Sequence, residues 1–452
     1  MAPKFGTSGL RGLVTELTPT LVADYTRAFL AVCPVGSGLW VARDLRASSP
    51  RLAEVVIAAA RHEGVAVTDC GAVPTPALAM AAMDAGAAAI MVTGSHIPAD
   101  RNGLKFYVPR GEITKHDEAA ILGALGRGSA GLMAGRRGCM QASGDWAARY
   151  RRAFGRCLHG LKVGVWAHSA VSREGLVAGL EALGARVAVL GQSDTFVPVD
   201  TEAVPRHVRA QFVAWADGLD AIVSTDGDGD RPLVADATGR IVPGDVLGQI
   251  TAALVGAEVV VTTVSANTGV DLSGRFARVV RTRIGSPFVI AAMDAAGGRV
   301  VGYEPNGGFL LGFDADGSNG PLPRLMTRDS LLPIVAALLE AKRAGSLAAR
   351  VASEPARFTV TDRLEDVPVE VSQALLARLS ASALANFLAP LGRVASVDQT
   401  DGLRATLEGG DIVHLRPSGN APEFRVYAES GTPDAAAALM ALAIAQVQGA
   451  LG

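Results

Sequence analysis

The sequence predicts an α/β protein with three related α/β/α modules, each with a mixed, mainly parallel sheet, followed by a C-terminal α+β domain. One observation is length, because 452 residues are too many for one ordinary core and predict several domains. A second is that apolar strand patterns alternate with helical patterns, and this alternation restarts twice. A third is a change near the C-terminus, where short strands follow one another through tight turns, which is typical of an antiparallel sheet.

The first module is expected to span residues 1–142. The uninterrupted apolar run Leu39-Trp40-Val41-Ala42 indicates a buried strand, and a segment with helical periodicity follows it. Short right-handed crossovers between such strands predict a parallel sheet. Strands are expected at 39–42, 65–68 and 87–92, and helices at 51–62 and 77–83.

The later modules are expected at 143–243, 244–352 and 353–452. The second and third repeat the alternation of strand and helix, whereas the fourth has several strands and then one helix. In the second and third modules we expect strands at 161–166, 186–190, 219–224, 259–263 and 299–303, with helices at 173–183 and 287–296. In the fourth we expect strands at 358–362, 393–398, 402–407 and 411–416, and a helix at 434–448.

Composition narrows the class of function. The formal net charge of −2 gives no electrostatic case for nucleic acid or an anionic membrane, and we expect neither as a partner. The longest apolar run, within residues 435–445, is too short to span a bilayer and is interpreted as a buried helix. No signal-type apolar stretch follows Met1, and no two cysteines have C-x-x-C spacing. These features predict a cytoplasmic protein with reduced thiols, and we expect a monomer.

The first candidate site is the loop Thr93-Gly94-Ser95-His96-Ile97-Pro98. Ser95 follows an apolar strand, and open parallel sheets bind ligands at the carboxyl ends of their strands. Its hydroxyl could carry a phosphoryl group. Lys105, a few residues further on, could contact a phosphate or transfer a proton. An ordinary serine-containing turn would explain this loop if it stood alone.

The second candidate site is the loop Asp226-Gly227-Asp228-Gly229-Asp230-Arg231. Its carboxylates alternate with glycines, which let the backbone wrap so that all three side chains converge on one cation. Hard divalent ions such as magnesium take oxygen ligands and often bind a phosphate oxygen as well. Arg231 could hold the same phosphate through two hydrogen bonds. A solvated acidic turn is the alternative, whereas an EF-hand is excluded because the required glutamate is missing.

Two further loops carry polar side chains suited to a phosphosugar. Glu304 and Asn306, in loop 302–308 after a predicted strand, could bind sugar hydroxyls, although a plain glycine-rich turn would serve the fold equally well. The loop 416–425 has two arginines, a hydroxyl, an amide and open backbone N–H groups, which together suit an anion. A surface salt bridge in a structural turn is the alternative there.

These four loops, in this order, resemble those of the α-D-phosphohexomutase superfamily. The resemblance covers the whole chain, from Phe5-Gly6-Thr7-Ser8-Gly9-Leu10-Arg11-Gly12 to the loop at 416–425. It implies four domains around a central cleft, with one loop from each domain. It also implies an enzyme that moves phosphate between the C1 and C6 oxygens of a hexose. Mg²⁺ is the implied cofactor, hexose 1,6-bisphosphate the implied activator, and a phosphosugar the implied substrate.

The resemblance also implies a role for each candidate residue. Ser95 would be the phosphoserine and would share Mg²⁺ with the three aspartates of the acidic loop. The residues implied at the transfer site are Arg11, His96, Lys105 and Arg231, with Lys105 as the candidate general acid or base. The metal ligands implied are Ser95, Asp226, Asp228 and Asp230. The residues implied for substrate binding are Glu304 and Asn306 on the sugar hydroxyls, and Arg416, Ser418, Asn420 and Arg425 on the phosphate that is not transferred.

Some positions depart from the commonest family pattern. Gly94 and Ile97 replace an alanine and an asparagine in the serine loop, and Gly308 stands where many members have a histidine. Asn420 and Ala421 replace threonine and glutamate. Together these variants are most similar to those of bacterial phosphomannomutases, which implies mannose 6-phosphate and mannose 1-phosphate as substrates.

Two alternatives stay open at this point. One keeps the enzyme class and changes the sugar, giving a phosphoglucomutase or a phosphoglucosamine mutase. The other is a catalytically silent relative that only binds a sugar phosphate. The glycine at position 308 is the single feature that favours the silent relative, because a histidine relay is absent there.

Overall fold

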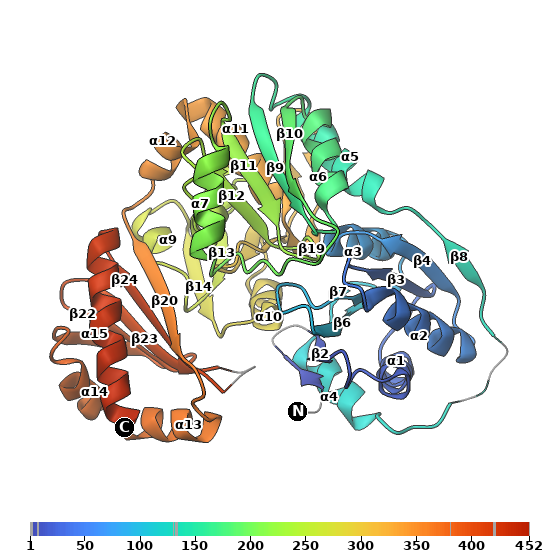
Figure 1. Cartoon of the computed structure of the whole chain (residues 1–452), viewed down its shortest axis with the longest axis horizontal. Coiled ribbons are helices and arrows are strands. Elements are labelled where there is room, and N and C mark those ends of the chain that lie inside the picture. The colour runs from blue at the N-terminus through green and yellow to red at the C-terminus, as the bar shows by residue number, and fades with distance from the viewer. Residues whose placement is uncertain are drawn as a thin grey trace.

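The computed structural model describes residues 3–6, 9–129, 131, 134–379, 381–418 and 422–451. Four sheets and one two-stranded ribbon follow one another along these residues. Figure 1 shows the first sheet in blue and the last in orange to red, on opposite sides of the green and yellow modules. The expected α/β class, with mixed sheets before a final antiparallel sheet, is confirmed. The residue limits of the four domains stay a prediction.

The first sheet has eight strands in the order β1-β2-β6-β5-β3-β4-β8, with β7 paired to β6. Its β4-β3-β5 centre is parallel, and β6 runs antiparallel to β5, so the end of β5 lies beside the start of β6. The strands are β1 Lys4–Phe5, β2 Leu10–Leu13, β3 Leu39–Arg43, β4 Val67–Ala72, β5 Ala88–Val92, β6 Arg101–Val108, β7 Gly111–Glu112 and β8 Arg137–Cys139. The helices are α1 Pro19–Val32, α2 Ser49–His62, α3 Thr75–Asp84 and α4 Lys115–Gly123.

The second sheet has the order β10-β9-β11-β12, in which β10, β9 and β11 are parallel and β12 is antiparallel to β11. The tight connection between β11 and β12 is the acidic loop. The strands are β9 Lys162–His168, β10 Arg186–Gln192, β11 Ala221–Thr225 and β12 Pro232–Asp236. The helices are α5 Ser143–Phe154, α6 Arg173–Ala182 and α7 Arg206–Trp215.

The third sheet has the order β14-β13-β15-β16-β19, with parallel pairing of β13 to both β14 and β15. The loop with Glu304 joins β15 to β16. The strands are β13 Val259–Thr263, β14 Arg278–Thr282, β15 Val300–Tyr303, β16 Phe309–Leu311 and β19 Leu325–Asp329, and the ribbon is β17 Ala315–Asp316 with β18 Pro321–Leu322. The helices are α8 Gly244–Leu254, α9 Gly269–Leu272, α10 Ser286–Ala296 and α11 Leu331–Ala344.

The fourth sheet is antiparallel throughout, in the order β20-β24-β23-β22-β21. The sequence did not predict β24, although it pairs with both β20 and β23 and carries Arg425. The strands are β20 Phe358–Leu364, β21 Val394–Asp398, β22 Leu403–Leu407, β23 Ile412–Pro417 and β24 Phe424–Ser430. The helices are α12 Leu347–Ala352, which precedes the sheet, α13 Val369–Arg378, α14 Ala381–Leu388 and α15 Pro433–Leu451.

The last helix differs from its expected form. α15 has 19 residues and is, by length and composition, apolar enough to cross a membrane. It was expected to be buried, but only 28% of the apolar window lies inside the protein. One face, with Leu439, Met440 and Ala443, packs in the core of the fourth sheet, while Leu442 is exposed. Length and composition alone are weak evidence for a membrane span, since a helix packed on a sheet passes the same criterion.

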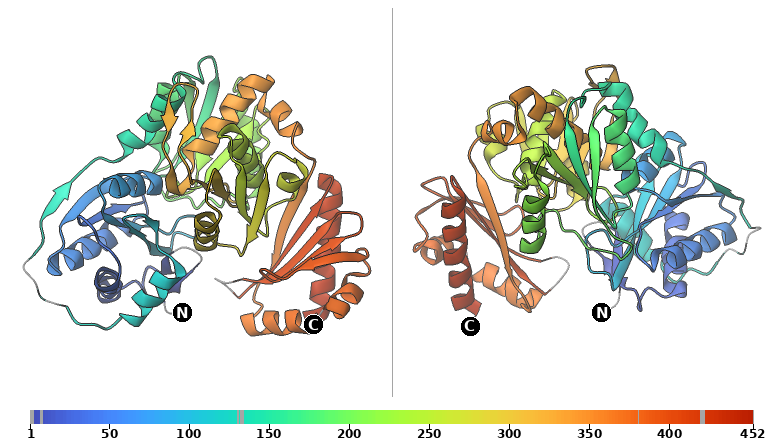
Figure 2. Two further views of the ribbon diagram at one scale, coloured as in Figure 1. Left: turned by 180° about the vertical axis from the view of Figure 1, so that it is seen from behind. Right: turned by 45° about the horizontal axis from the view of Figure 1, so that its top comes forward.

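The hydrophobic cores show which modules are joined. One cluster contains Val163 and Val223 of the second sheet together with Ile250 and Val335 of the third, so these modules share a core. The cluster of the fourth sheet contains residues of that module alone. Figure 2 shows the ribbon of the fourth module, in orange to red, beside the other modules from behind and with the top tilted forward. The fourth module therefore folds around its own core.

Candidate active site

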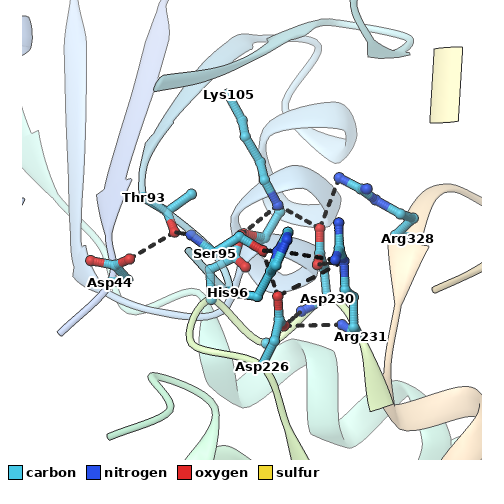
Figure 3. A network of polar contacts seen from close by, with 12 residues as sticks. Asp44, Thr93, Ser95, His96, Lys105, Asp226, Asp230, Arg231 and Arg328 are labelled. Atoms are coloured by element: carbon cyan, nitrogen blue, oxygen red, sulfur yellow. Dashed lines mark hydrogen bonds and ion pairs between the residues drawn. The ribbon is translucent and has the colours of Figure 1, made fainter. Parts of the chain in front are cut away.

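The serine loop and the acidic loop lie in direct contact (Figure 3). Ser95 follows β5 and Asp226 follows β11, so each loop leaves the carboxyl end of a strand. Ser95 Oγ donates a hydrogen bond to Asp226 Oδ2 at 2.6 Å. Thr75 N donates to the carbonyl oxygen of Asp228 at 2.9 Å. The two halves of the predicted transfer site are thus brought together.

Ser95 itself has an unusual backbone conformation. Its φ is 52°, in the left-handed region that few residues other than glycine adopt. Ser95 N donates to Thr93 Oγ1 at 2.7 Å, and Thr93 Oγ1 donates to Asp44 Oδ2 at 2.7 Å. Strain of this kind persists where the surroundings impose it, and it is typical of functional sites. The backbone therefore holds the Ser95 hydroxyl toward the acidic loop.

Arg46 supports the serine loop from behind. Its guanidinium donates to four carbonyl oxygens of residues 95–101, at 2.6 to 2.9 Å. Arg46 Nε lies 3.2 Å from Asp44 Oδ2, and Arg46 Cζ lies 4.0 Å from the centre of the Phe196 ring. A Cβ atom at position 94 would lie 2.6 Å from Arg46 Cζ. Gly94, where the family usually has alanine, therefore makes room for this arginine.

Asp226, Asp228 and Asp230 form a buried carboxylate group. One oxygen of each lies within 4.8 Å of the others. Asp228 Oδ1 and Asp230 Oδ1 are buried without a hydrogen-bond partner, and a divalent cation is the kind of ligand that such oxygens bind. Burial, followed by the charges of the other two aspartates, raises the pKa of Asp226 well above its usual value. The three aspartates can therefore hold a metal ion.

Lys105 reaches this group from β6. Its ammonium donates to Asp228 Oδ2 at 2.5 Å and to Asp230 Oδ2 at 2.6 Å. Thr75 Oγ1 also donates to Asp228 Oδ2, at 2.6 Å. Burial alone would raise the pKa of Asp228, but the charge and hydrogen bonds of Lys105 reverse this and lower it. Lys105 Nζ is therefore in direct contact with two of the candidate metal ligands.

His96 and Arg231 lie beside the Ser95 hydroxyl. His96 Nδ1 lies 3.3 Å from Ser95 Oγ and 3.0 Å from Arg231 Nη1. Burial, followed by the charge of Arg231, lowers the pKa of His96 well below its usual value. The imidazole is therefore neutral, and its Nδ1 accepts from Arg231. Arg231 Nε also lies 4.0 Å from Asp226 Oδ2 and 3.9 Å from Asp230 Oδ1.

Arg11, on β2, belongs to the same group of charges. Burial, followed by Arg231, lowers its pKa to about 10, while Asp228 and Asp230 act in the opposite sense. Its Nη2 is buried without a hydrogen-bond partner. Arg11 therefore has a donor available for an anion at the transfer site.

The loop between β15 and β16 contributes Glu304 and Asn306, which are both buried. Asn306 Oδ1 accepts a hydrogen bond from Gly308 N at 3.0 Å, so this oxygen closes the loop and leaves the amide nitrogen for a ligand. Glu304 Oε1 is 3.8 Å from Arg328 Nη1. Arg328 also lies 3.0 Å from Asp230, which connects this loop to the acidic loop.

The predicted phosphate-binding residues lie at one end of the fourth sheet. Arg416 and Arg425 are cross-strand neighbours on β23 and β24, and the Nε of each is buried without a partner. Ser418 is buried next to them. Asn420 lies outside the described residues.

Several residues of the site were not predicted from the sequence. Asp44 and Arg46 lie between β3 and α2, and no role was assigned to them from the sequence. Thr75, at the start of α3, and Arg328, on β19, were also assigned no role. Their signal was weak, because each acts through a partner that is distant in the chain.

A buried serine, three carboxylates and several arginines brought together in one group define an enzyme that transfers phosphoryl groups with the help of a metal ion. Comparisons with known proteins agree with this class. Family models described as phosphoglucomutase/phosphomannomutase match this chain: α/β/α domain I at residues 2–130, α/β/α domain III at 243–358 and the C-terminal domain at 357–447. The chain belongs to the phosphoglucomutase/phosphomannomutase family.

The relatives cover nearly the whole chain. A phosphomannomutase of Sinorhizobium fredii is 45% identical, over 98% of this chain and 98% of its own length. A phosphomannomutase of Salmonella muenchen is 41% identical, over 99% of this chain and 96% of its own. Among solved structures, a phosphoglucomutase/phosphomannomutase family protein of Burkholderia thailandensis superposes with a TM-score of 0.74 at 21% identity, covering 98% and 97% of the two chains, which supports the fold.

Proposed function

We propose that this protein is a phosphomannomutase, which interconverts mannose 6-phosphate and mannose 1-phosphate through a phosphoserine and a hexose 1,6-bisphosphate. One observation carries the proposal: Ser95 Oγ lies 2.6 Å from a carboxylate of a buried three-aspartate group. Two relatives above 40% identity that are named phosphomannomutase support the choice of sugar.

The proposed reaction has two half-reactions. In the first, the phosphoryl group on Ser95 moves to the free hydroxyl of the sugar phosphate. The Ser95 Oγ–P bond breaks and a sugar O–P bond forms; the sugar hydroxyl gives up its proton and Ser95 Oγ, the leaving oxygen, takes one up, so no net proton is released. In the second, the bisphosphate presents its other phosphate, which returns to Ser95. Arg11 and Arg231 stabilise the negative charge on the phosphoryl group as it moves.

Lys105 is the proposed general acid or base. Its Nζ donates to Asp228 and Asp230 of the acidic loop, so it is placed to give a proton to the leaving oxygen and to take one from the attacking hydroxyl. His96 is suited to orient Arg231, because it is a neutral acceptor of that arginine's N–H.

Asp226, Asp228 and Asp230, together with a phosphate oxygen on Ser95, would hold Mg²⁺. The unpartnered oxygens of Asp228 and Asp230 fit a hard cation. When bound, this ion supplies positive charge that stabilises the transferred group. Two of these carboxylates also hold cations in place: Asp228 and Asp230 both pair with Lys105, and Asp230 pairs with Arg328 as well.

Substrate binding is proposed to divide between two loops. Glu304 and the amide nitrogen of Asn306 would bind sugar hydroxyls, and Arg416, Ser418 and Arg425 would bind the phosphate that stays in place. We call Arg416, Ser418 and Arg425 the phosphate clamp. Because the clamp holds whichever phosphate is not reacting, one transfer site can serve both half-reactions. Asn420 is assigned to the same clamp. We also propose that the protein is cytoplasmic, as its composition predicts, and that it acts as a monomer, because a single chain supplies every loop of the proposed site.

The test is a coupled assay with Mg²⁺ and a hexose 1,6-bisphosphate as activator. Mannose, glucose and glucosamine phosphates are compared by kcat/KM, and we expect the mannose phosphates to give the highest value. A higher value for another sugar would contradict the assigned substrate, and no turnover of any of them would contradict the mutase activity. Intact mass gives a second measurement: Ser95 should gain one phosphate from the bisphosphate, and the Ser95→Ala variant should gain none.

A further inference from the structure

Arg328 is a buried cation at the junction of three modules. It lies on β19 and is only 1% exposed. Its Nη2 is 3.0 Å from Asp230 Oδ2 in the acidic loop, and its Nη1 is 3.8 Å from Glu304 Oε1 in the loop between β15 and β16. Its Nε is 3.7 Å from Glu112 Oε1, on β7 of the first module. Figure 3 shows its guanidinium pointing at Asp230, on the side of that carboxylate away from Ser95.

The third carboxylate is itself fixed between modules. Glu112 Oε2 accepts a hydrogen bond from Ser286 Oγ at 2.5 Å, at the start of α10. Thr327 Oγ1, next to Arg328 in the chain, lies 3.5 Å from Glu112 Oε1. Glu112 is therefore an anchored anion, and it limits the positions that the guanidinium can take.

Gly308 explains why an arginine fits here. A Cβ atom at position 308 would lie 2.9 Å from Arg328 Cδ and 3.1 Å from Arg328 Cγ. A side chain at 308 and the observed Arg328 cannot share this space without a shift. Position 308 is the place where the family resemblance implies a histidine. In this chain the arginine from β19 occupies the space beside it.

We propose that Arg328 is a positioning residue of the mutase reaction: it fixes the sugar-binding carboxylate of Glu304 relative to the metal-binding carboxylate of Asp230, and Gly308 provides the space for it. The inference rests on the proposed function. The guanidinium keeps its charge throughout turnover, so Arg328 supplies a fixed geometry and a fixed positive charge where a histidine would supply a titratable group. This role also removes the argument for a silent relative, because Gly308 then belongs to a working site.

Three variants test the proposal. Arg328→Met removes the charge, Arg328→Lys keeps it, and Gly308→Ala pushes a methyl group against the arginine while leaving its charge intact. Misplacing a reacting group by about 1 Å lowers rates by about 100-fold, so we expect Arg328→Met to lower kcat/KM by about that factor. Arg328→Lys should recover part of this loss, and Gly308→Ala should reduce kcat/KM by about tenfold.

Matched controls separate positioning from folding. Arg350→Met removes another buried arginine, which pairs with Glu340 and Glu354 away from the site. Gly175→Ala adds a methyl group where the nearest atom is 3.6 Å away. Both controls should keep kcat/KM, whatever they do to the unfolding midpoint. A binding measurement avoids turnover: in a Ser95→Ala background, Arg328→Met should raise the calorimetric Kd for mannose 6-phosphate by about tenfold.

The outcomes distinguish this inference from the proposed function. An inactive wild-type protein would contradict the mutase assignment itself. An active wild-type protein whose folded Arg328→Met variant keeps both kcat/KM and Kd would overturn the role of Arg328. If Arg328→Met does not fold, Arg328→Lys and Gly308→Ala decide: unchanged kinetics in both overturns the proposal, and a loss in Gly308→Ala, larger than in Gly175→Ala, supports it.

Discussion

The close approach of Arg46 to Gly94 predicts that alanine, the usual family residue at position 94, is harmful in this chain. Gly94→Ala introduces the commonest family residue at this position. In this chain the new methyl group would lie 2.6 Å from Arg46 Cζ and 2.7 Å from Arg46 Nε, distances that real Cβ contacts essentially never show. Arg46 must move, and its guanidinium is held on several sides, so we expect the substitution to be harmful.

The size of the effect follows from the bonds that Arg46 makes. Its guanidinium donates to the carbonyl oxygens of Ser95 at 2.9 Å, Ile97 at 2.6 Å, Pro98 at 2.7 Å and Arg101 at 2.9 Å. A hydrogen bond from a charged group contributes about 1.5–3 kcal/mol. If the shift breaks two of the four bonds, the free energy of unfolding falls by about 4 kcal/mol.

Urea unfolding and steady-state kinetics measure this prediction. We expect a lower unfolding midpoint for Gly94→Ala and a kcat lowered by about 100-fold, because the carbonyl of Ser95 loses its support. Gly175→Ala is the control, since its methyl group meets nothing closer than 3.6 Å. In a double-mutant cycle, Gly94→Ala should cost much less once Arg46→Ala has removed the clash. A Gly94→Ala variant within about 0.5 kcal/mol of wild type, with full kcat, would refute the reasoning.

Three further predictions concern the metal site, pH and the clamp. Asp228→Asn should weaken metal binding and lower kcat by about 100-fold, which a Mg²⁺ titration of activity would measure; unchanged Mg²⁺ dependence would contradict the assigned site. Burial raises the pKa of Asp245 from its usual value to about 6, so the folded state holds a proton that the unfolded state has lost. Stability should therefore fall by about 3 kcal/mol as pH rises from about 4 to 6. Asp245→Asn should flatten this dependence in urea titrations, and an identical pH profile would count against it. Arg425→Ala should raise KM and release more of the bisphosphate intermediate, measured by an assay of free bisphosphate; wild-type KM without added release would place the clamp elsewhere.

The parts of the site that could be predicted from sequence are those in which chemistry and backbone constraint coincide. The acidic loop has three carboxylates with glycines between them, and Ser95 directly follows a strand. Such segments carry their signal within a few residues. The alternation of strands and helices in the first three modules was predictable for a similar reason, because periodicity is local. In the fourth module one helix after the strands was expected, and this was wrong, since α13 and α14 lie between β20 and β21.

The parts that could not be predicted depend on tertiary contacts. Arg46 acts on carbonyl oxygens about fifty residues away, and Arg328 reaches three separate modules, so neither role has a local pattern. β24 was missed because Arg425 drew its segment into the phosphate loop, although β24 is a buried strand between β20 and β23. The effect of Gly308 was hidden for the same reason, since the space it provides is filled by a residue from another strand.

In the fourth sheet, the point where the chain enters and the clamp arginine lie at opposite ends of the same two strands. The chain enters it at Phe358, which pairs with Ser430, and the clamp arginine Arg425 pairs with Arg363 at the other end of the same two strands. Five residues of strand separate these ends, a distance of about 17 Å. A rotation of about 10° at the entry would carry the clamp through about 3 Å, the full length of a hydrogen bond. The fourth module has a core of its own, which is what a rotation of the module as one body would require. A small rotation of the fourth module about its entry, next to α12, would therefore be enough to make or break the contact between Arg425 and a bound phosphate.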